Sequence, residues 1–388
     1  MDILIKNCIN RFTELYNQEC IVVQSPGRIN LIGEHTDYNK GFVLPAAIDK
    51  AAYIAIGKRL DDEIYLYAMD LDEYHQTTVA NLQSSPGHWS AYLLGIVDQL
   101  KKRGCIPTGF NVVLSCNIPI GGGMSSSAAV ECATVFALNE LFNFGLERLA
   151  MVQMAQKAEN EFVGVQCGIM DMFASMMGKK EHVILLDCSN MAYQYFPLHL
   201  GNYKIVLFDT TIKHSLAGGQ YNLRRQQCEE GVTYLQSKYK HINSLRDATI
   251  DMIDENLLKA TSAVVYNRCK YVVEEISRVQ EACADLLANN LIDFGKKMYA
   301  THAGLKNLYE VSCAELDLLV DWAKNENAIL GSRMMGGGFG GCTINLIEDS
   351  AIESIFKQFE AAYKLQTGLQ LKMYVTLPQA GTSVLHYN

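Results

Sequence analysis

Basic residues are scarce in this chain, and none of them form a run. The 388 residues include 33 Lys and Arg against 42 Asp and Glu, which gives a formal net charge of −9. Proteins that bind nucleic acid usually gather basic residues on one face or along one helix. We therefore expect no nucleic-acid partner. An anionic substrate would have to be held locally, by backbone amides, a metal ion or a few placed cations.

Signals for export and for membrane insertion are also lacking. The N-terminus has no basic segment followed by a small-residue cleavage site, and apolar runs break well before the ~20 residues of a membrane span. The twelve cysteines form no C-x-x-C pair, and no N-x-S/T sequon occurs. These absences predict a cytoplasmic protein with reduced, mostly buried thiols, without disulfides, a zinc site or a membrane partner.

The chain is long enough for two or three domains, and its periodicity mixes helices with strands. Without strict alternation of strand and helix, this pattern indicates an α+β fold. No Pro/Ser-rich linker marks a boundary, and we place the division between residues 1–195 and 196–388. Helices are predicted at 3–16, 89–102, 125–142, 147–162, 168–177, 221–238, 262–287 and 313–325, and strands at 20–24, 110–117, 182–187, 203–209 and 342–346.

A glycine- and serine-rich segment lies between a predicted strand and a predicted helix. Glycines there let the backbone approach a ligand, and the free amides of a helix N-terminus attract phosphate. A serine hydroxyl at the same place could bind Mg²⁺. The alternative is a flexible loop that ends in an N-capping serine, and this segment alone does not decide between the two. Its residues are Gly121, Gly122, Gly123, Met124, Ser125, Ser126 and Ser127.

Other nucleotide-binding patterns fail in context. No G-x-x-x-x-G-K-[ST] sequence occurs, and the D-F-G at 293–295 has no preceding H-R-D loop. Residues 336–341 contain G-x-G-x-x-G, but they precede a predicted strand instead of joining a strand to a helix.

The segment 25–38 is unusually rich in polar side chains. Arg28, Glu34, His35 and Asp37 fall within ten residues and alternate with apolar ones. Such a set makes a poor core, and it suits a pocket that reads the hydroxyls of a small polar ligand.

Together these segments resemble the galactokinases, a branch of the GHMP small-molecule kinases. The family's phosphate loop, P-x-x-x-G-L-S-S-S-A, matches residues 119–128 with Met124 in place of Leu. Residues 25–38 match its sugar signature and residues 336–341 its C-terminal glycine motif. The resemblance runs from about residue 8 to the end. It implies two α+β lobes, an N-terminal ribosomal-protein-S5-domain-2-like lobe and a C-terminal ferredoxin-like lobe, with the site between them.

The resemblance also implies an activity, which is transfer of a phosphoryl group from ATP to the 1-hydroxyl of α-D-galactose. This reaction would be the first committed step of galactose catabolism. By the same resemblance, the loop binds ATP, Ser127 and Glu159 bind Mg²⁺, and Arg28 and Asp171 are catalytic. From the residues alone, Glu159 could be a solvated helix residue and Asp171 a helix-start acid.

The sugar ligands that the resemblance implies are Glu34, His35, Thr36, Asp37 and Tyr221. Tyr221 lies in the H-S-L-A-x-x-x-Y-x-x-R-R pattern of residues 214–225. His35 as a structural hydrogen-bonding residue and Tyr221 as a packing residue are the alternatives. Three positions depart from the family pattern and leave the exact sugar preference open: Met172 for Gln, Gln220 for Glu and Tyr271 for His.

Two rival functions stay open at this point. One is a kinase for N-acetylgalactosamine or another pyranose, and the other is a non-catalytic sensor that binds sugar and ATP. A sensor would tolerate damaged catalytic residues, whereas Arg28, Ser127, Ala128, Glu159 and Asp171 are all present. No obligatory protein partner is inferred.

Overall fold

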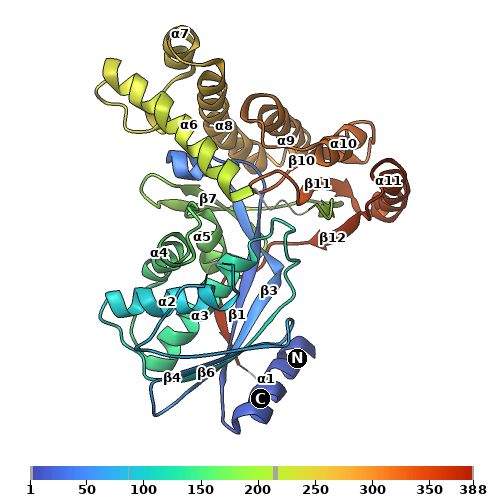
Figure 1. The fold of residues 1–388 in the computed structure, drawn as a ribbon. Coiled ribbons are helices and arrows are strands. Elements are labelled where there is room, and N and C mark those ends of the chain that lie inside the picture. The colour runs from blue at the N-terminus through green and yellow to red at the C-terminus, as the bar shows by residue number, and fades with distance from the viewer. Residues whose placement is uncertain (1–2, 86, 213–216, 387–388) are drawn as a thin grey trace.

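The computed structural model describes residues 3–85, 87–212 and 217–386. Two lobes lie one above the other in Figure 1, and both ends of the chain lie beside α1 in the lower lobe. The helices of the lower lobe and its connections are α1 (Ile3–Tyr16), α2 (Ser90–Lys102), α3 (Ser126–Phe142), α4 (Arg148–Lys157) and α5 (Met170–Met177).

A six-stranded sheet forms the centre of the lower lobe, in the order β13-β1-β3-β6-β4-β5. Its neighbours pair antiparallel except β4 and β6, which run parallel. The strands are β1 (Ile21–Asn30), β3 (Pro45–Lys58), β4 (Glu63–Ala68), β5 (Glu73–Thr78), β6 (Phe110–Cys116) and β13 (Ser383–Leu385).

Helices cover both faces of this sheet, because successive residues of its strands point to opposite faces and both faces are apolar. Val22 packs on the α1 side with Cys8 and Phe12, whereas Val23 and Ile54 belong to the large core that includes α3. Strand β1 was predicted to end at residue 24. It continues through the sugar signature to Asn30, with a register shift between Pro26 and Arg28, so the signature arginine is fixed on a buried central strand.

A separate three-stranded antiparallel sheet has the order β2-β7-β8, and it pairs a strand from between β1 and β3 with two strands that follow α5. Its strands are β2 (Phe42–Val43), β7 (His182–Asp187) and β8 (Tyr193–Pro197).

The upper lobe has a four-stranded antiparallel sheet in the order β10-β11-β9-β12. With α11 joining β11 to β12, this order is that of a ferredoxin-like sheet. Val206 and Phe208 of β9 pack against α10 and α11, while Ile205 and Leu207 face the core that both lobes share. The strands are β9 (Tyr203–Asp209), β10 (Ile329–Met334), β11 (Cys342–Glu348) and β12 (Lys372–Thr376).

Most helices of the upper lobe are inserted between β9 and β10 and lie at its top in Figure 1. They are α6 (Ala217–Lys238), α7 (Ile250–Ala260), α8 (Ala263–Leu287), α9 (Leu291–Gly304) and α10 (Ala314–Ala323), with α11 (Ile352–Thr367) near the end of the chain.

The predicted α+β class is confirmed, as is each predicted helix, within a few residues at its ends. The helix expected at 147–162 ends at Lys157 and continues as a π-helical segment, η2 (Ala158–Val163), which carries Glu159. The predicted strands correspond to β1, β6, β7, β9 and β11, whereas the remaining strands and the helices α7, α9 and α11 were not predicted. Several of them are short or lack a clear period, and tertiary packing decides their structure.

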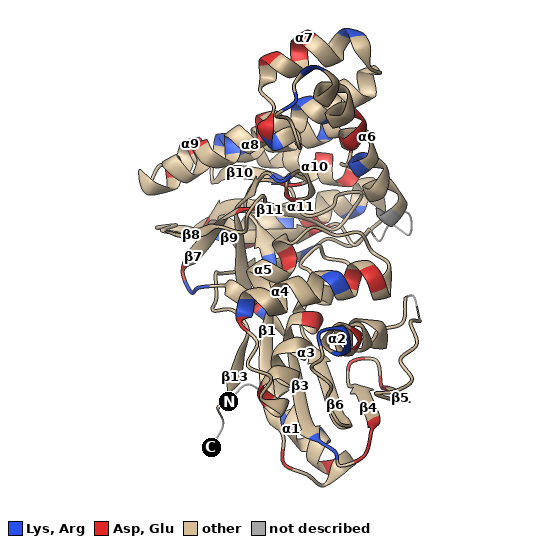
Figure 2. Cartoon of the chain, turned by 90° about the vertical axis from the view of Figure 1, so that its left-hand side faces the viewer, with Lys and Arg blue, Asp and Glu red and all other residues tan. Residues whose placement is uncertain are grey.

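The end of the chain returns to the lower lobe, where β13 pairs with β1. Among the described residues, no helix has the length and apolar character needed to cross a membrane. Acidic and basic residues are interspersed over both lobes in Figure 2.

Candidate active site

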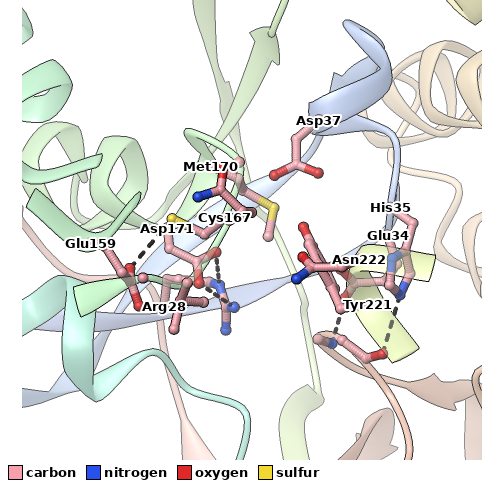
Figure 3. A pocket seen from close by; sticks show the side chains of 16 residues that line it. Arg28, Glu34, His35, Asp37, Glu159, Cys167, Met170, Asp171, Tyr221 and Asn222 are labelled. Atoms are coloured by element: carbon pink, nitrogen blue, oxygen red, sulfur yellow. Dashed lines mark hydrogen bonds and ion pairs between the residues drawn. The ribbon is translucent and has the colours of Figure 1, made fainter. Parts of the chain in front are cut away.

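A cavity of about 380 Å³ opens between the lobes, a size typical of small-molecule sites. Figure 3 shows Arg28, Glu159 and Asp171 on one side of it and His35, Tyr221 and Asn222 on the other, with Asp37 above. Of the residues predicted for the sugar, the metal and the chemistry, all except Thr36 and Ser127 line this cavity: Arg28, Glu34, His35, Asp37, Glu159, Asp171 and Tyr221. The phosphate loop from Gly121 to Ser127 does not contribute to the lining.

Arg28 and Asp171 form a two-point ion pair. Nε of Arg28 donates to Oδ1 of Asp171 at 2.8 Å, and Nη2 donates to Oδ2 at 2.7 Å. The third guanidinium nitrogen, Nη1, donates to the backbone carbonyl of Gly123. Ser125 adds a hydroxyl donor to Oδ2 of Asp171. One guanidinium therefore joins the predicted base to the phosphate loop.

The phosphate loop has the backbone that its glycines predict. Gly121 and Gly123 have φ of 80° and 72°, and Ser125 adopts the left-handed region at 57° before α3 begins at Ser126. The loop lies against the C-terminal glycine motif, since a Cβ built on Gly341 would be 3.5 Å from the carbonyl oxygen of Gly121. The free amides at the start of α3 fit a phosphate group.

Glu159 provides the carboxylate of a possible metal site. Burial and the charge of Asp171 raise its pKa to about 7, while hydrogen bonds from Cys167 and Ser127 and the charge of Arg28 lower it. A buried acid beside a second acid and a hydroxyl fits a divalent cation, which would relieve both effects. Within the described residues, no three His, Cys, Asp or Glu side chains gather into a metal-binding group. Mg²⁺ suits such an open site, because it is usually held by one or two carboxylates together with substrate phosphates.

Asp37 lies against the turn that precedes α5. A Cβ at Gly168 would overlap Oδ2 of Asp37, so only glycine leaves room for this carboxylate. Burial, and then the charge of Asp171, raise the pKa of Asp37 to about 7, while the backbone of Tyr38 lowers it. The carboxylate lines the cavity, where it can accept hydrogen bonds from sugar hydroxyls.

His35 is held from both sides and is neutral. Its Nδ1 lies 2.7 Å from the hydroxyl of Tyr38 and its Nε2 lies 3.2 Å from the carbonyl of Gly337, so Nε2 carries the proton. Tyr38 in turn contacts the hydroxyl of Tyr309 at 2.8 Å. Burial lowers the pKa of His35 to about 3. This residue lines the cavity and also joins the lower lobe to the glycine motif.

Glu34 and Thr36 both form hydrogen bonds within the protein, but only Glu34 also lines the cavity. Oε1 of Glu34 accepts two hydrogen bonds from Arg333, each 3.1 Å, and one from the amide of Gly336 at 2.8 Å. The hydroxyl of Thr36 is directed at the carbonyls of Gly33 and Phe42, at 3.0 and 2.6 Å. Thr36 is fully buried outside the cavity, and its contact with sugar stays a prediction.

Tyr221 enters the cavity from α6 in the upper lobe, with its ring 5.4 Å from that of His35. The start of its motif, His214 to Leu216, lies outside the described residues. No pattern in the sequence indicated that Ser125 contacts Asp171, or that Gly168 and Asn222 line the cavity. The hydrogen bonds from Arg333 to Glu34 join residues 299 positions apart, so they exist only in the folded chain.

Three family descriptions match this chain. The galactokinase galactose-binding signature matches residues 10–58, and the N-terminal and C-terminal domains of GHMP kinases match 91–179 and 282–365. Galactokinases of Thermosipho africanus and Fusobacterium nucleatum are each 39% identical, over 91% and 96% of this chain and 96% and 97% of theirs.

Solved structures agree with this likeness. The crystal structure of Lactococcus lactis galactokinase complexed with galactose is 34% identical, has a TM-score of 0.95, and is matched over 98% of this chain and 100% of that one. Mevalonate kinase of Methanococcus jannaschii, 20% identical with a TM-score of 0.67 over 93% and 98% of the two chains, shares the fold. The motifs, the two lobes and these likenesses agree, and this chain belongs to the galactokinases of the GHMP kinase family.

Proposed function

We propose that this chain transfers the γ-phosphoryl group of ATP to the 1-hydroxyl of α-D-galactose. The observation that carries the proposal is the Arg28–Asp171 pair, which lies in one cavity with Asp37 and Tyr221 and touches the phosphate loop at Gly123. Sugar-binding groups, a candidate base and a phosphate site therefore meet at one place. Membership of the galactokinase family supports galactose as the sugar.

Asp171 is the residue that would receive the proton of the sugar hydroxyl, or hold that hydroxyl in line for transfer. Its two hydrogen bonds from Arg28 fix the orientation of the carboxylate. The same guanidinium can offset negative charge that develops on the transferred group. Positioning and electrostatics supply much of the catalysis in phosphoryl transfer, so both roles of Asp171 are compatible with this geometry.

The sugar would be held by Asp37 and by the groups around it. Asp37, Glu34 and His35 come from the signature segment of the lower lobe, and Tyr221 comes from the upper lobe. Two lobes that each contribute ligands exclude water when they close on a substrate.

Mg²⁺ and ATP are the cofactor and second substrate of the proposal. Ser127 and Glu159 would hold the ion, which would screen the charges of the phosphates. The loop from Gly121 to Ser127 would hold the phosphates through its amides.

Two further parts of the proposal concern the chain as a whole. All twelve cysteines are unpaired, which supports a reducing compartment such as the cytoplasm. The four-stranded sheet begins at Tyr203, which supports a division of the chain just after β8 (Tyr193–Pro197), a few residues beyond the proposed boundary at 195/196. Strand β13 then returns to the first lobe.

A panel of sugars tests the proposed substrate. The kcat/KM for ADP release should be highest with galactose, and it should be lower with glucose and with N-acetylgalactosamine. Preference for the acetylated sugar would reassign the substrate, and absence of sugar-dependent ADP release would favour a sensor.

A further inference from the structure

Glu131 on α3 is a buried acid whose side chain has no partner. Its residue is 0% exposed, and neither carboxyl oxygen has a hydrogen-bond partner among the described residues. Glu275, also 0% exposed, differs sharply. It accepts hydrogen bonds from the amide of Gly33 at 2.9 Å and from the hydroxyl of Thr301, and it pairs with Arg278.

A buried acid without a partner, such as Glu131, destabilises the fold. A polar group taken from water without a new hydrogen bond costs free energy, and a charged one costs more. The neighbours on α3 are apolar or small, so a methionine would fill the same place without that cost. A buried polar group without partners therefore calls for an explanation, such as a functional role or an ion.

The position of Glu131 relates it to the proposed magnesium site. Glu131 follows Ser127 by four residues, so both side chains lie on one face of α3. Burial raises the pKa of Glu131 well above its ordinary value, and the negative charges of Glu159 and Asp171 raise it further. Tyr92 of α2 is affected by the same acids, because burial and then Glu159 and Glu131 raise its pKa. Glu131 is therefore near enough to Glu159 and Asp171 for their charges to act on it.

Three acids of this region, Glu131, Glu159 and Asp171, act on one another, while Arg28 is already bound to both oxygens of Asp171. Burial and the neighbouring acids favour the protonated form of Glu131 in the ligand-free protein. A divalent cation bound beside these acids would favour the ionised form instead.

We propose that Glu131 is a positioning residue of the magnesium site and supports the Ser127–Glu159 pair. Its carboxyl group would gain a hydrogen-bond partner only when the ion and its waters are bound. This inference rests on the Mg²⁺ site of the proposed function. Groups just outside the ligands of a metal orient those ligands, and their loss commonly lowers metal affinity by about 10- to 100-fold.

The test measures binding of Mn²⁺ to the purified enzyme with a non-hydrolysable ATP analogue, by electron paramagnetic resonance of the free ion. Glu131→Gln should weaken Mn²⁺ binding by about tenfold or more. Glu140→Gln is the matched control, since Glu140 lies on the same helix and is exposed. It should leave the affinity unchanged.

Thermal unfolding of the ligand-free protein gives a second measurement. Glu131→Met should raise the melting temperature, because it removes an unpaired buried acid. A residue with a purely structural role would behave in the opposite way, with a lower melting temperature and unchanged Mn²⁺ affinity, and that result would overturn the inference.

Glu159→Gln separates the inference from the proposed function. Normal Mn²⁺ affinity in Glu131→Gln beside a clear loss in Glu159→Gln would overturn only the role of Glu131. Normal affinity in both variants would show that the ion binds elsewhere, and would overturn the proposed metal ligands together with the inference.

Discussion

Arg28 and Asp171 are 143 positions apart in the chain, and their side chains meet through two hydrogen bonds of 2.8 and 2.7 Å. Arg28 is almost fully buried on β1, whereas the side chain of Asp171 is 27% exposed at the start of α5. The acid therefore keeps contact with the cavity while the arginine fixes its orientation. A paired carboxylate that is still accessible is suited to meet a substrate hydroxyl.

Replacement of Asp171 by Asn should separate catalysis from binding. The amide has nearly the same shape but cannot accept the sugar proton, so kcat should fall by about 10²- to 10⁴-fold. The dissociation constant for galactose should stay within about tenfold of the wild type. Steady-state kinetics and calorimetry measure the two quantities. Near-normal turnover would remove Asp171 from its proposed role.

Asp37→Ala should instead weaken the binding of galactose. Sugar hydroxyls would lose a buried acceptor, and galactose binding should weaken by about 1–3 kcal/mol. The affinity for an ATP analogue should not change, because Asp37 lines the cavity and the residues from Gly121 to Ser127 do not. Calorimetric titration with each ligand tests this, and an unchanged galactose dissociation constant would count against Asp37 as a ligand.

Thr36→Val tests whether every residue of the signature binds sugar. The hydroxyl of Thr36 contacts two backbone carbonyls and lies outside the cavity. Loss of the hydroxyl removes a buried hydrogen bond to these carbonyls, so we expect the protein to lose about 1–3 kcal/mol of stability. The KM for galactose should change less than twofold or so. Denaturant unfolding and steady-state kinetics give both values. A large rise in KM at unchanged stability would instead make Thr36 a sugar ligand.

Metal affinity should depend on pH through Glu159. Its pKa in the ligand-free site is about 7, raised by burial and by Asp171. Because the metal binds the ionised form, protons compete with it below that pKa, and lowering the pH from 8 to 6 should weaken Mn²⁺ binding about tenfold. The same pH change should have a much smaller effect in Glu159→Gln. Equal pH dependence in the two proteins would assign the titration to another group.

The sequence indicated most of the residues that line the cavity, but fewer of the individual strands and helices around it. Polar residues packed into 25–38 and a glycine–serine loop before a helix are local patterns with direct chemical meaning. Family resemblance then related them to Glu159 and Asp171, which the residues alone could not assign. The four-stranded sheet of the upper lobe was harder to predict, because β9 and β10 are separated by about 120 residues of helix.

Contacts between distant segments were also beyond sequence reasoning. The buried Arg333, which holds Glu34, and the unpartnered Glu131 gain their meaning only from tertiary neighbours. Thr36 lies inside the sugar signature, but its hydroxyl points to backbone carbonyls, which the sequence did not indicate.

Identification of the product by ³¹P nuclear magnetic resonance tests the central claim most directly. With galactose, ATP and Mg²⁺, we expect one sugar phosphate for each ADP, with its phosphorus coupled to the anomeric proton. Phosphate on a different hydroxyl, or ADP formed without any sugar phosphate, would contradict the claim that this cavity brings the 1-hydroxyl of galactose to the terminal phosphate of ATP.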